Sequence, residues 1–336
     1  MIIPFFIPHA GCPHQCVFCN QKSITGENTP PDISLLPEKI SAYLRTNNKQ
    51  GSVQLAFYGG SFTALPLETQ LTYLTAVQPF IRSGTIQGIR ISTRPDNINE
   101  ELLPILKTHH VQCIELGVQS MNDTVLFLSG RGHTAADTVR ASQQLKKYDF
   151  ITGLQLMPGL PGDSSEYFMN TVDAVIDMKP DFVRIYPALV IKGTPLQALL
   201  EQGLYTPLSL KVAVAVCGHA LQRFEKAGIS VIRIGLQSTR ELEKQGTILA
   251  GPYHPAFRQL VESSLLLDKM RLALKNRDSN TTSAVFQVNP KDLSAALGQR
   301  RSNMAILKSE FGLQDIRVLA GHQLLRRGEI SPLSFS

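Results

Sequence analysis

Three cysteines stand close together near the start of the chain, in the segment Cys12-Pro13-His14-Gln15-Cys16-Val17-Phe18-Cys19. Three thiolates on one loop can bind three of the four irons of a 4Fe–4S cluster. The fourth iron then has no protein ligand from this loop, and its open coordination positions can bind a small chelating molecule. The spacing of these cysteines therefore indicates a cluster that takes an external ligand.

A zinc ion is the alternative occupant of this loop. Zinc sites use four nitrogen or sulfur ligands, and His9 or His14 can complete a set of three cysteines and one histidine. The two other cysteines, Cys113 and Cys217, lie alone in apolar strand and helix patterns, so they are predicted to be core residues. Five cysteines with three in one tight group do not fit the disulfide framework of a secreted protein.

The elements that position this loop follow a regular alternation of strands and helices. Strands are predicted at residues 2–7, 53–58, 88–92, 111–117, 152–156, 181–186 and 230–236. Helical patterns lie between them at 35–46, 67–80, 98–109, 134–148, 165–178 and 209–227. This alternation predicts an α/β fold of parallel βα units in a full or partial barrel. In such barrels the functional residues lie in the loops that follow the strands.

The cysteine spacing, with an aromatic residue before the last cysteine, resembles the radical S-adenosylmethionine (radical SAM) superfamily. The resemblance implies a partial (βα)6-type barrel in which Cys12, Cys16 and Cys19 bind a 4Fe–4S cluster. It also implies that S-adenosylmethionine binds the open iron and is cleaved to a 5′-deoxyadenosyl radical. The cluster would receive its electron from a donor such as flavodoxin or ferredoxin.

Six further motifs resemble, in the same order, the radical domain of the Elongator catalytic-subunit family. They are the segments 59–66, Thr93-Arg94-Pro95-Asp96, Gly117-Val118-Gln119-Ser120, Arg131-Gly132-His133-Thr134, 157–161 and 186–194. The resemblance runs from about residue 8 to 205 and implies an RNA substrate, with tRNA modification as the expected activity. The cysteine spacing is more compact than in that family. The chain is also expected to be a stand-alone relative without the family's acetyltransferase domain.

The resemblance assigns contacts with the cofactor to residues at the strand ends. Phe18 is expected near the adenine and Gln119 or Ser120 near the ribose or carboxylate, while Met157 fits either the adenine side or the core. Ser61 stands where many members of the superfamily have glutamate. The full set of predicted cofactor-binding residues is Phe18, Tyr58, Gly59, Gly60, Ser61, Arg94, Gln119, Ser120, Met157, Arg184 and Tyr186.

Two arginines in this set have alternative partners. Arg94 and Arg184 can each pair with the carboxylate of the cofactor or with a phosphate of the substrate. A structural ion pair is equally consistent with the sequence, and Asp96 and Glu115 are the acids expected to hold them in that case.

The net charge of +6 is concentrated at the C-terminus, since residues 269–336 contain eleven Lys or Arg and five Asp or Glu. A basic tail favours a polyanionic partner, although a basic solvent-exposed surface is the simpler explanation. Residues 288–303 resemble the K-homology RNA-binding motif, in which a helix–Gly-x-x-Gly–helix loop clamps a nucleic-acid backbone. Here Gly298 is the first glycine and Arg301 replaces the second, so Arg300 and Arg301 are predicted RNA contacts.

Three domains are predicted: a barrel at 1–236, a connecting helical segment and linker at 237–283, and a small basic K-homology-like unit at 284–336. The sequence shows neither an apolar run of membrane-spanning length nor a secretory signal, so a cytoplasmic protein is expected. Three functions stay open at this point. They are a radical enzyme acting on RNA, a radical enzyme acting on a small metabolite, and a non-enzymatic RNA-binding protein with a structural metal site.

Overall fold

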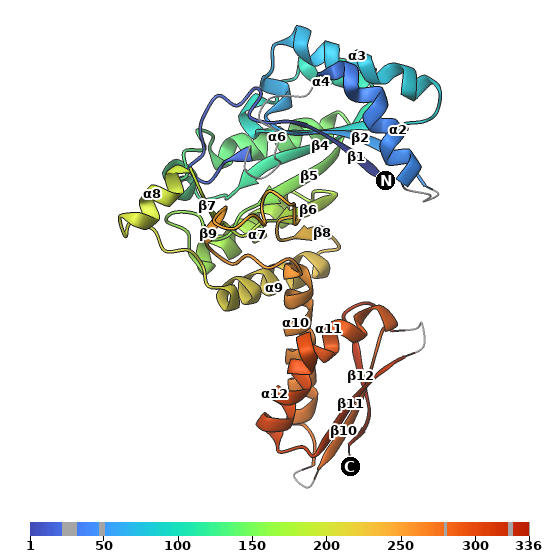
Figure 1. Ribbon diagram of the computed structural model, residues 1–336, viewed down its shortest axis with the longest axis vertical. Coiled ribbons are helices and arrows are strands. Elements are labelled where there is room, and N and C mark those ends of the chain that lie inside the picture. The colour runs from blue at the N-terminus through green and yellow to red at the C-terminus, as the bar shows by residue number, and fades with distance from the viewer. Residues whose placement is uncertain (22–31, 47–50, 279–280, 322–324, 336) are drawn as a thin grey trace. The chain divides into compact units, whose positions relative to one another are not determined.

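The computed structural model describes all residues of the chain except 22–31, 47–50, 279–280, 322–324 and 336. The chain divides into two compact units, one formed by residues 1–210 and 220–253 and the other by residues 211–219 and 254–336 (Figure 1). The helix predicted within the connecting segment is α10 (Phe257–Lys275), and it belongs to the second unit. Within the described ranges, no helix has the length and hydrophobicity that crossing a membrane requires.

The first unit is built on seven parallel strands in the order β1-β2-β3-β4-β5-β6-β8. β1 and β8 form the two edges of this sheet, so it is an open, partial barrel, and the predicted fold class is confirmed. All seven predicted strands are present. Their bounds are β1 Ile2–Ile7, β2 Gln54–Gly59, β3 Gly88–Thr93, β4 Val111–Gln119, β5 Ile151–Leu156, β6 Phe182–Ile185 and β8 Ser230–Ile234.

Each helical pattern predicted between the strands corresponds to one helix, as expected for parallel βα units. These helices are α2 Leu36–Thr46, α3 Leu67–Arg82, α4 Leu102–Thr108, α6 Ala135–Lys147, α7 Ser165–Asp177 and α9 Leu210–Lys226. Further short elements lie in the loops: α5 Asp123–Leu128, α8 Pro195–Glu201, the antiparallel pair of β7 Val190–Ile191 with β9 Ile248–Ala250, and the 3-10 turns η1 Ile33–Leu35, η2 Phe62–Ala64 and η3 Pro95–Asn97. α5, α8 and the pair of β7 with β9 were not predicted, because such segments are too short for a hydrophobic period to be seen.

The two faces of the sheet differ in their chemistry. On the outer face, Phe5 and Phe57 are fully buried and pack against Tyr73 of α3. The inner face carries charged and polar side chains, among them Arg90 and Glu115. A parallel sheet that is purely structural is apolar on both faces. The inner face is therefore the part of this unit that is available for binding and chemistry.

The second unit combines α10 with a three-stranded sheet in the order β11-β10-β12. β10 is parallel to β11 and antiparallel to β12, and these elements enclose a separate core that includes Met270, Phe286 and Leu307. The bounds are β10 Ser283–Val288, η4 Pro290–Asp292, α11 Leu293–Leu297, η5 Gln299–Arg301, α12 Ser302–Phe311, β11 Asp315–Ala320 and β12 Ile330–Phe335. β12 was not predicted, because it is a mostly exposed edge strand that contains Pro332.

Candidate functional site

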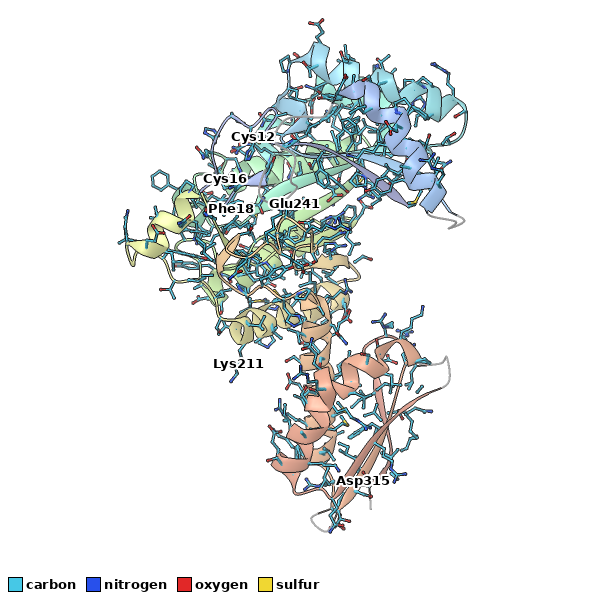
Figure 2. All side chains as sticks on the ribbon, in the orientation of Figure 1. Cys12, Cys16, Phe18, Lys211, Glu241 and Asp315 are labelled. Atoms are coloured by element: carbon cyan, nitrogen blue, oxygen red, sulfur yellow. The ribbon has the colours of Figure 1, made fainter. Side chains whose placement is uncertain are left out.

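The cysteine loop follows β1 and lies directly against the loop that follows β2 (Figure 2 labels Cys12, Cys16 and Phe18). Gly60 N donates a hydrogen bond to Ile7 O at 3.0 Å, and Ser61 N donates one to Ala10 O at 2.9 Å. A Cβ atom on Gly60 would lie 1.9 Å from Ala10 O, and one on Gly11 would lie 2.3 Å from Ser61 O. Both glycines are therefore required for the close approach of these two backbones.

The loop that follows α5 packs against the other side of the cysteine loop. Val17 N donates to Ser129 O at 3.1 Å, and a Cβ on Gly132 would lie 2.4 Å from the ring of His14. The guanidinium of Arg131 reaches the cysteines themselves, donating to Cys16 Sγ at 3.2 Å and to Gly117 O at 2.5 Å. Sequence analysis gave Arg131 no role. The available signal was an arginine placed between two glycines in a strand-end loop.

The environment of the three thiols fits an iron–sulfur cluster. Cys16 is buried, and Cys12 and Cys19 are partly exposed. Burial raises the pKa of Cys12, and burial together with the neighbouring cysteines raises the pKa of Cys19 to about 12. The positive charge of Arg131 opposes both increases. Three such thiols become thiolates when a cationic metal group binds them, and the irons of a cluster supply that charge.

The histidines that would complete a zinc site are not placed for that role. His9 Nε2 accepts a hydrogen bond from Gln21 N at 3.1 Å, and the ring of His14 lies beside Gly132. The described residues contain no group of three or more His, Cys, Asp or Glu side chains spaced for a single metal ion. A cluster, in contrast, binds each thiolate at a separate iron. The donor set therefore fits the cluster better than the zinc ion.

The side chain of Ser61 connects two strand-end loops. Its hydroxyl lies 2.9 Å from Thr93 Oγ1 and accepts hydrogen bonds from Arg94 N at 3.3 Å and Asn97 Nδ2 at 3.2 Å. Arg94 binds Asp96 through two hydrogen bonds of 3.0 Å each. Of the partners predicted for Arg94, the structural ion-pair partner Asp96 is the one present in the structure. Ser61 and Arg94 therefore hold the loop after β2 and the loop after β3 together at the edge of the site.

Glu115 holds two arginines on the inner face of the sheet. Arg184 donates to both carboxylate oxygens of Glu115, at 2.6 and 3.2 Å, which is the pairing predicted from the sequence. Arg90 donates to Glu115 Oε1 at 2.9 Å, and Tyr58 OH donates to the same oxygen at 2.7 Å. Burial and then the charge of Glu115 raise the pKa of Tyr58, so its phenol stays protonated. One carboxylate between two guanidinium groups leaves an excess of positive charge.

A row of partly exposed residues crosses the inner face and includes Tyr58 and Arg184 of this network. Strands β2, β3, β4, β5, β6 and β8 each contribute one residue to it, and these are Tyr58, Ser92, Gly117, Gln155, Arg184 and Arg233. We call this set the inner strip. Because most other residues in these strands are buried, the inner strip is where solvent, and therefore a ligand, reaches the sheet. Gln155 and Arg233 were not predicted, since neither belongs to a recognised motif.

Gln119 combines burial with a strained backbone at the end of β4. Its φ is 67°, and the register of β4 against β5 shifts between Leu116 and Gln119. Bulges and left-handed residues other than glycine occur often at functional sites because they direct a side chain toward a ligand. The amide of Gln119 accepts a hydrogen bond from Gln155 Nε2 at 3.2 Å. Ser120 is also buried, but its hydroxyl accepts a hydrogen bond from Asn122 N at 3.1 Å and so supports the loop.

The remaining predicted residues lie around the cysteine loop and the inner strip. Phe18 is buried in an apolar cluster with Val125 and Leu160, and Met157 packs against the same cluster. The hydroxyl of Tyr186 accepts a hydrogen bond from Arg184 at 3.3 Å. The predicted cofactor residues of the first unit are thus gathered where strands β1 to β6 end. Arg300 and Arg301 belong to the second unit.

Replacing Gly60 with alanine is expected to reduce iron incorporation strongly. The new Cβ would meet the backbone oxygen of Ala10, which cannot rotate away as a flexible side chain can, so the cysteine loop must move. Iron and sulfide content after anaerobic reconstitution measures the effect. Gly218→Ala is the matched control, because its Cβ would meet the movable tip of Leu265 at 3.2 Å. Iron content equal to that of the parent in Gly60→Ala would contradict the steric argument.

Comparisons with known proteins identify the family of this chain. Residues 6–175 match the family model of the radical SAM superfamily, and residues 180–266 match its Radical_SAM C-terminal domain. The tRNA uridine(34) acetyltransferase of Methanocaldococcus infernus is 30% identical over 253 residues, which cover 63% of this chain and 47% of the relative. Elongator complex protein 3 of Homo sapiens is 26% identical over 253 residues, which cover 60% of this chain and 45% of that protein.

A solved structure, the archaeal Elp3 of Methanocaldococcus infernus with an N-terminal deletion, matches with a TM-score of 0.64 at 23% identity. The match covers 81% of this chain and 63% of that one, and it supports the fold. The chain spans about half the length of the acetyltransferase and Elongator relatives that it matches.

Proposed function

This chain belongs to the radical SAM superfamily, and we propose that it generates a 5′-deoxyadenosyl radical that abstracts a hydrogen atom from a nucleotide of tRNA. It is an enzyme that uses a 4Fe–4S cluster and S-adenosylmethionine. The observation that carries the proposal is the cysteine loop, held between two glycine-containing loops with Arg131 donating to Cys16 Sγ.

In this proposal the residues of the chain bind, orient and shield the cofactors. Cys12, Cys16 and Cys19 hold the cluster, and the predicted residues at the ends of β1 to β5 contact S-adenosylmethionine, which leaves Arg184 and Tyr186 to the substrate. When bound, the two cofactors supply the electron and the radical. Phe18 and Met157 contribute an apolar wall that excludes water, and Gln119 offers its amide at the strand end. A one-electron donor of the flavodoxin or ferredoxin type reduces the cluster.

The names of the relatives support tRNA as the substrate. Because the aligned residues cover less than half of the acetyltransferase and Elongator relatives, the acetyl transfer in one of those names is not carried over to this chain. The test is a comparison of tRNA nucleosides by mass spectrometry between the parent strain and a deletion strain. A nucleoside that disappears on deletion, and returns with the parent gene but not with Cys16→Ala, supports the proposal. An unchanged nucleoside profile favours a small-metabolite substrate.

The second unit supports an RNA-binding role through its topology. β10, α11, α12 and β11 follow one another as strand–helix–helix–strand with the two strands parallel, and Gly298 to Arg301 connect the helices. Arg300 and Arg301 have φ values of 51° and 63°. The position that replaces the second glycine of the K-homology motif thus keeps a backbone conformation that glycine favours. We propose that this K-homology-like unit extends from α10 to β12.

Replacing Arg300 and Arg301 together with alanine is expected to weaken tRNA binding and reduce its dependence on salt. Each lost phosphate contact lowers the slope of log affinity against log salt by about 0.7 for single-stranded RNA. Filter binding over a range of salt concentrations measures both effects. The control is Arg82→Ala with Arg240→Ala, which removes the same charge from exposed sites of the first unit. Equal losses in both double variants would show that this loop has no special part in binding.

A further inference from the structure

We propose that Arg233 forms, with Arg184 and Tyr186, a subsite for an oxyanion on the inner face of the sheet, and that this oxyanion is a phosphate or carboxylate group of the substrate. The inference rests on the proposed function in taking the inner face as the substrate site. It adds the class of chemical group that the substrate must carry, and it uses a residue outside all the motifs that resemble known families.

The backbone of β8 places Arg233 on the inner face. Arg184 and Arg233 are partners across β6 and β8, so their side chains leave the sheet on the same side. The register shifts immediately before this pair, because Val183 is opposite Val231 and Ile232 is passed over. Without the shift Ile232 would stand opposite Arg184. Bulges that redirect a side chain in this way are common next to active sites.

The charges on the inner face do not balance. Glu115 is already shared by Arg90 and Arg184, both of which donate to it. Arg233 forms no hydrogen bond or ion pair with any residue in the described part of the chain, although it is half-buried. A guanidinium that is partly removed from water without an acidic partner is costly for the folded protein. A bound anion would remove this cost, because it would neutralise Arg233.

The neighbouring groups match an oxyanion. Arg184 NH1 donates to Tyr186 OH at 3.3 Å. Burial raises the pKa of Tyr186, although the charges of Arg184 and Arg233 act in the opposite direction, so the phenol keeps a proton that it can donate. Two guanidinium groups and a phenol within one row of the sheet offer planar, charge-assisted donors to a group with several oxygens.

The position in the sheet favours the substrate over the cofactor as the source of this oxyanion. β8 is the edge strand opposite β1 in sheet order, and β1 leads directly into the cysteine loop. S-adenosylmethionine would bind next to that loop, and it carries a carboxylate of its own. An experiment must therefore separate the carboxylate of the cofactor from an oxyanion of the substrate.

The test is calorimetric titration of the reconstituted holoenzyme with inorganic phosphate and with acetate, at constant ionic strength. Arg233→Gln is expected to weaken binding of phosphate, acetate or both about tenfold or more, which is the value of one charge-assisted hydrogen bond. Arg233→Lys should lose less, because it keeps the charge but not the planar fork. Arg82→Gln, an exposed arginine on α3, should bind both probes as the parent does. Affinity for S-adenosylmethionine should be unchanged in all three variants.

Three outcomes would overturn the subsite. They are a parent that binds neither probe, a parent-like affinity for both probes in Arg233→Gln, and a tenfold loss of S-adenosylmethionine affinity in that variant, which would assign Arg233 to the cofactor. Iron content and circular dichroism verify that each variant is folded. If Arg233→Gln does not fold, the anion affinity of Arg233→Lys is compared with that of the parent instead. Unaltered tRNA nucleosides in the deletion strain, together with a positive titration, would reject the tRNA substrate and leave the subsite standing.

Discussion

Replacing Cys16 with alanine is expected to abolish both cluster assembly and the cleavage of S-adenosylmethionine. Two remaining thiolates cannot hold the cluster stably, and Cys16 is the buried member of the three. It is also the cysteine whose sulfur accepts a hydrogen bond from Arg131, so the substitution removes a ligand and leaves a buried guanidinium without this acceptor. Iron and sulfide analysis of reconstituted protein, with chromatographic detection of 5′-deoxyadenosine, measures the two losses.

The matched controls are Cys113→Ala and Cys217→Ala. Both cysteines are fully buried in the core, so each change removes one sulfur atom without touching the cysteine loop. These variants should bind iron and cleave S-adenosylmethionine as the parent does, with a loss of about 1 kcal/mol in the free energy of unfolding. Full iron content and cleavage in Cys16→Ala would show that Cys16 is not a ligand.

The sheet of the first unit could be predicted because its strands carry a strong local signal. Each is a short apolar run followed by a glycine, a polar cluster or a turn, and each is separated from the next by a helical pattern. The antiparallel pair of β7 and β9 carries no such signal. It pairs Val190 with Ala250 across a long stretch of chain, and its strands are two and three residues long.

The candidate site could be predicted only where its chemistry is local in the sequence. The three cysteines are recognisable by their spacing, and Arg94 with Asp96 by their adjacency. Arg131 and Arg233 could not be assigned a role, because what each one does depends on another strand or loop. Arg131 reaches Cys16 because the loop that follows α5 packs against the cysteine loop. Arg233 lies on the inner face because the register between β6 and β8 shifts.

Glu115 is the second residue whose loss should have a large effect, and here the effect is on stability. Glu115→Gln keeps the size of the side chain but removes the charge that holds Arg90 and Arg184. Both pairs are largely buried, since the side chain of Glu115 is 7% exposed and those of the two arginines are 11% and 14% exposed. Breaking a buried pair from one side costs about 3 to 5 kcal/mol, because the opposite charge is left unpaired.

Chemical unfolding of anaerobic holoenzyme, followed by circular dichroism, measures this loss. Glu100→Gln is the control in the same unit. Glu100 pairs with Lys147 at 3.0 Å, but the two side chains are 48% and 63% exposed, so the loss should be below about 1 kcal/mol. If Glu115→Gln unfolds at the same denaturant concentration as Glu100→Gln, then water solvates the two arginines or a bound anion neutralises them, and the buried-pair argument is wrong.

A double variant measures the coupling between Glu115 and Arg184. Adding Arg184→Met to Glu115→Gln removes one of the two guanidinium groups that the first change leaves without a carboxylate. If the unpaired charge dominates, the double variant should be more stable than the sum of the two single losses predicts. Strict additivity would mean that the Glu115–Arg184 pair, through charge and hydrogen bonds together, adds no net coupling to the stability of the protein.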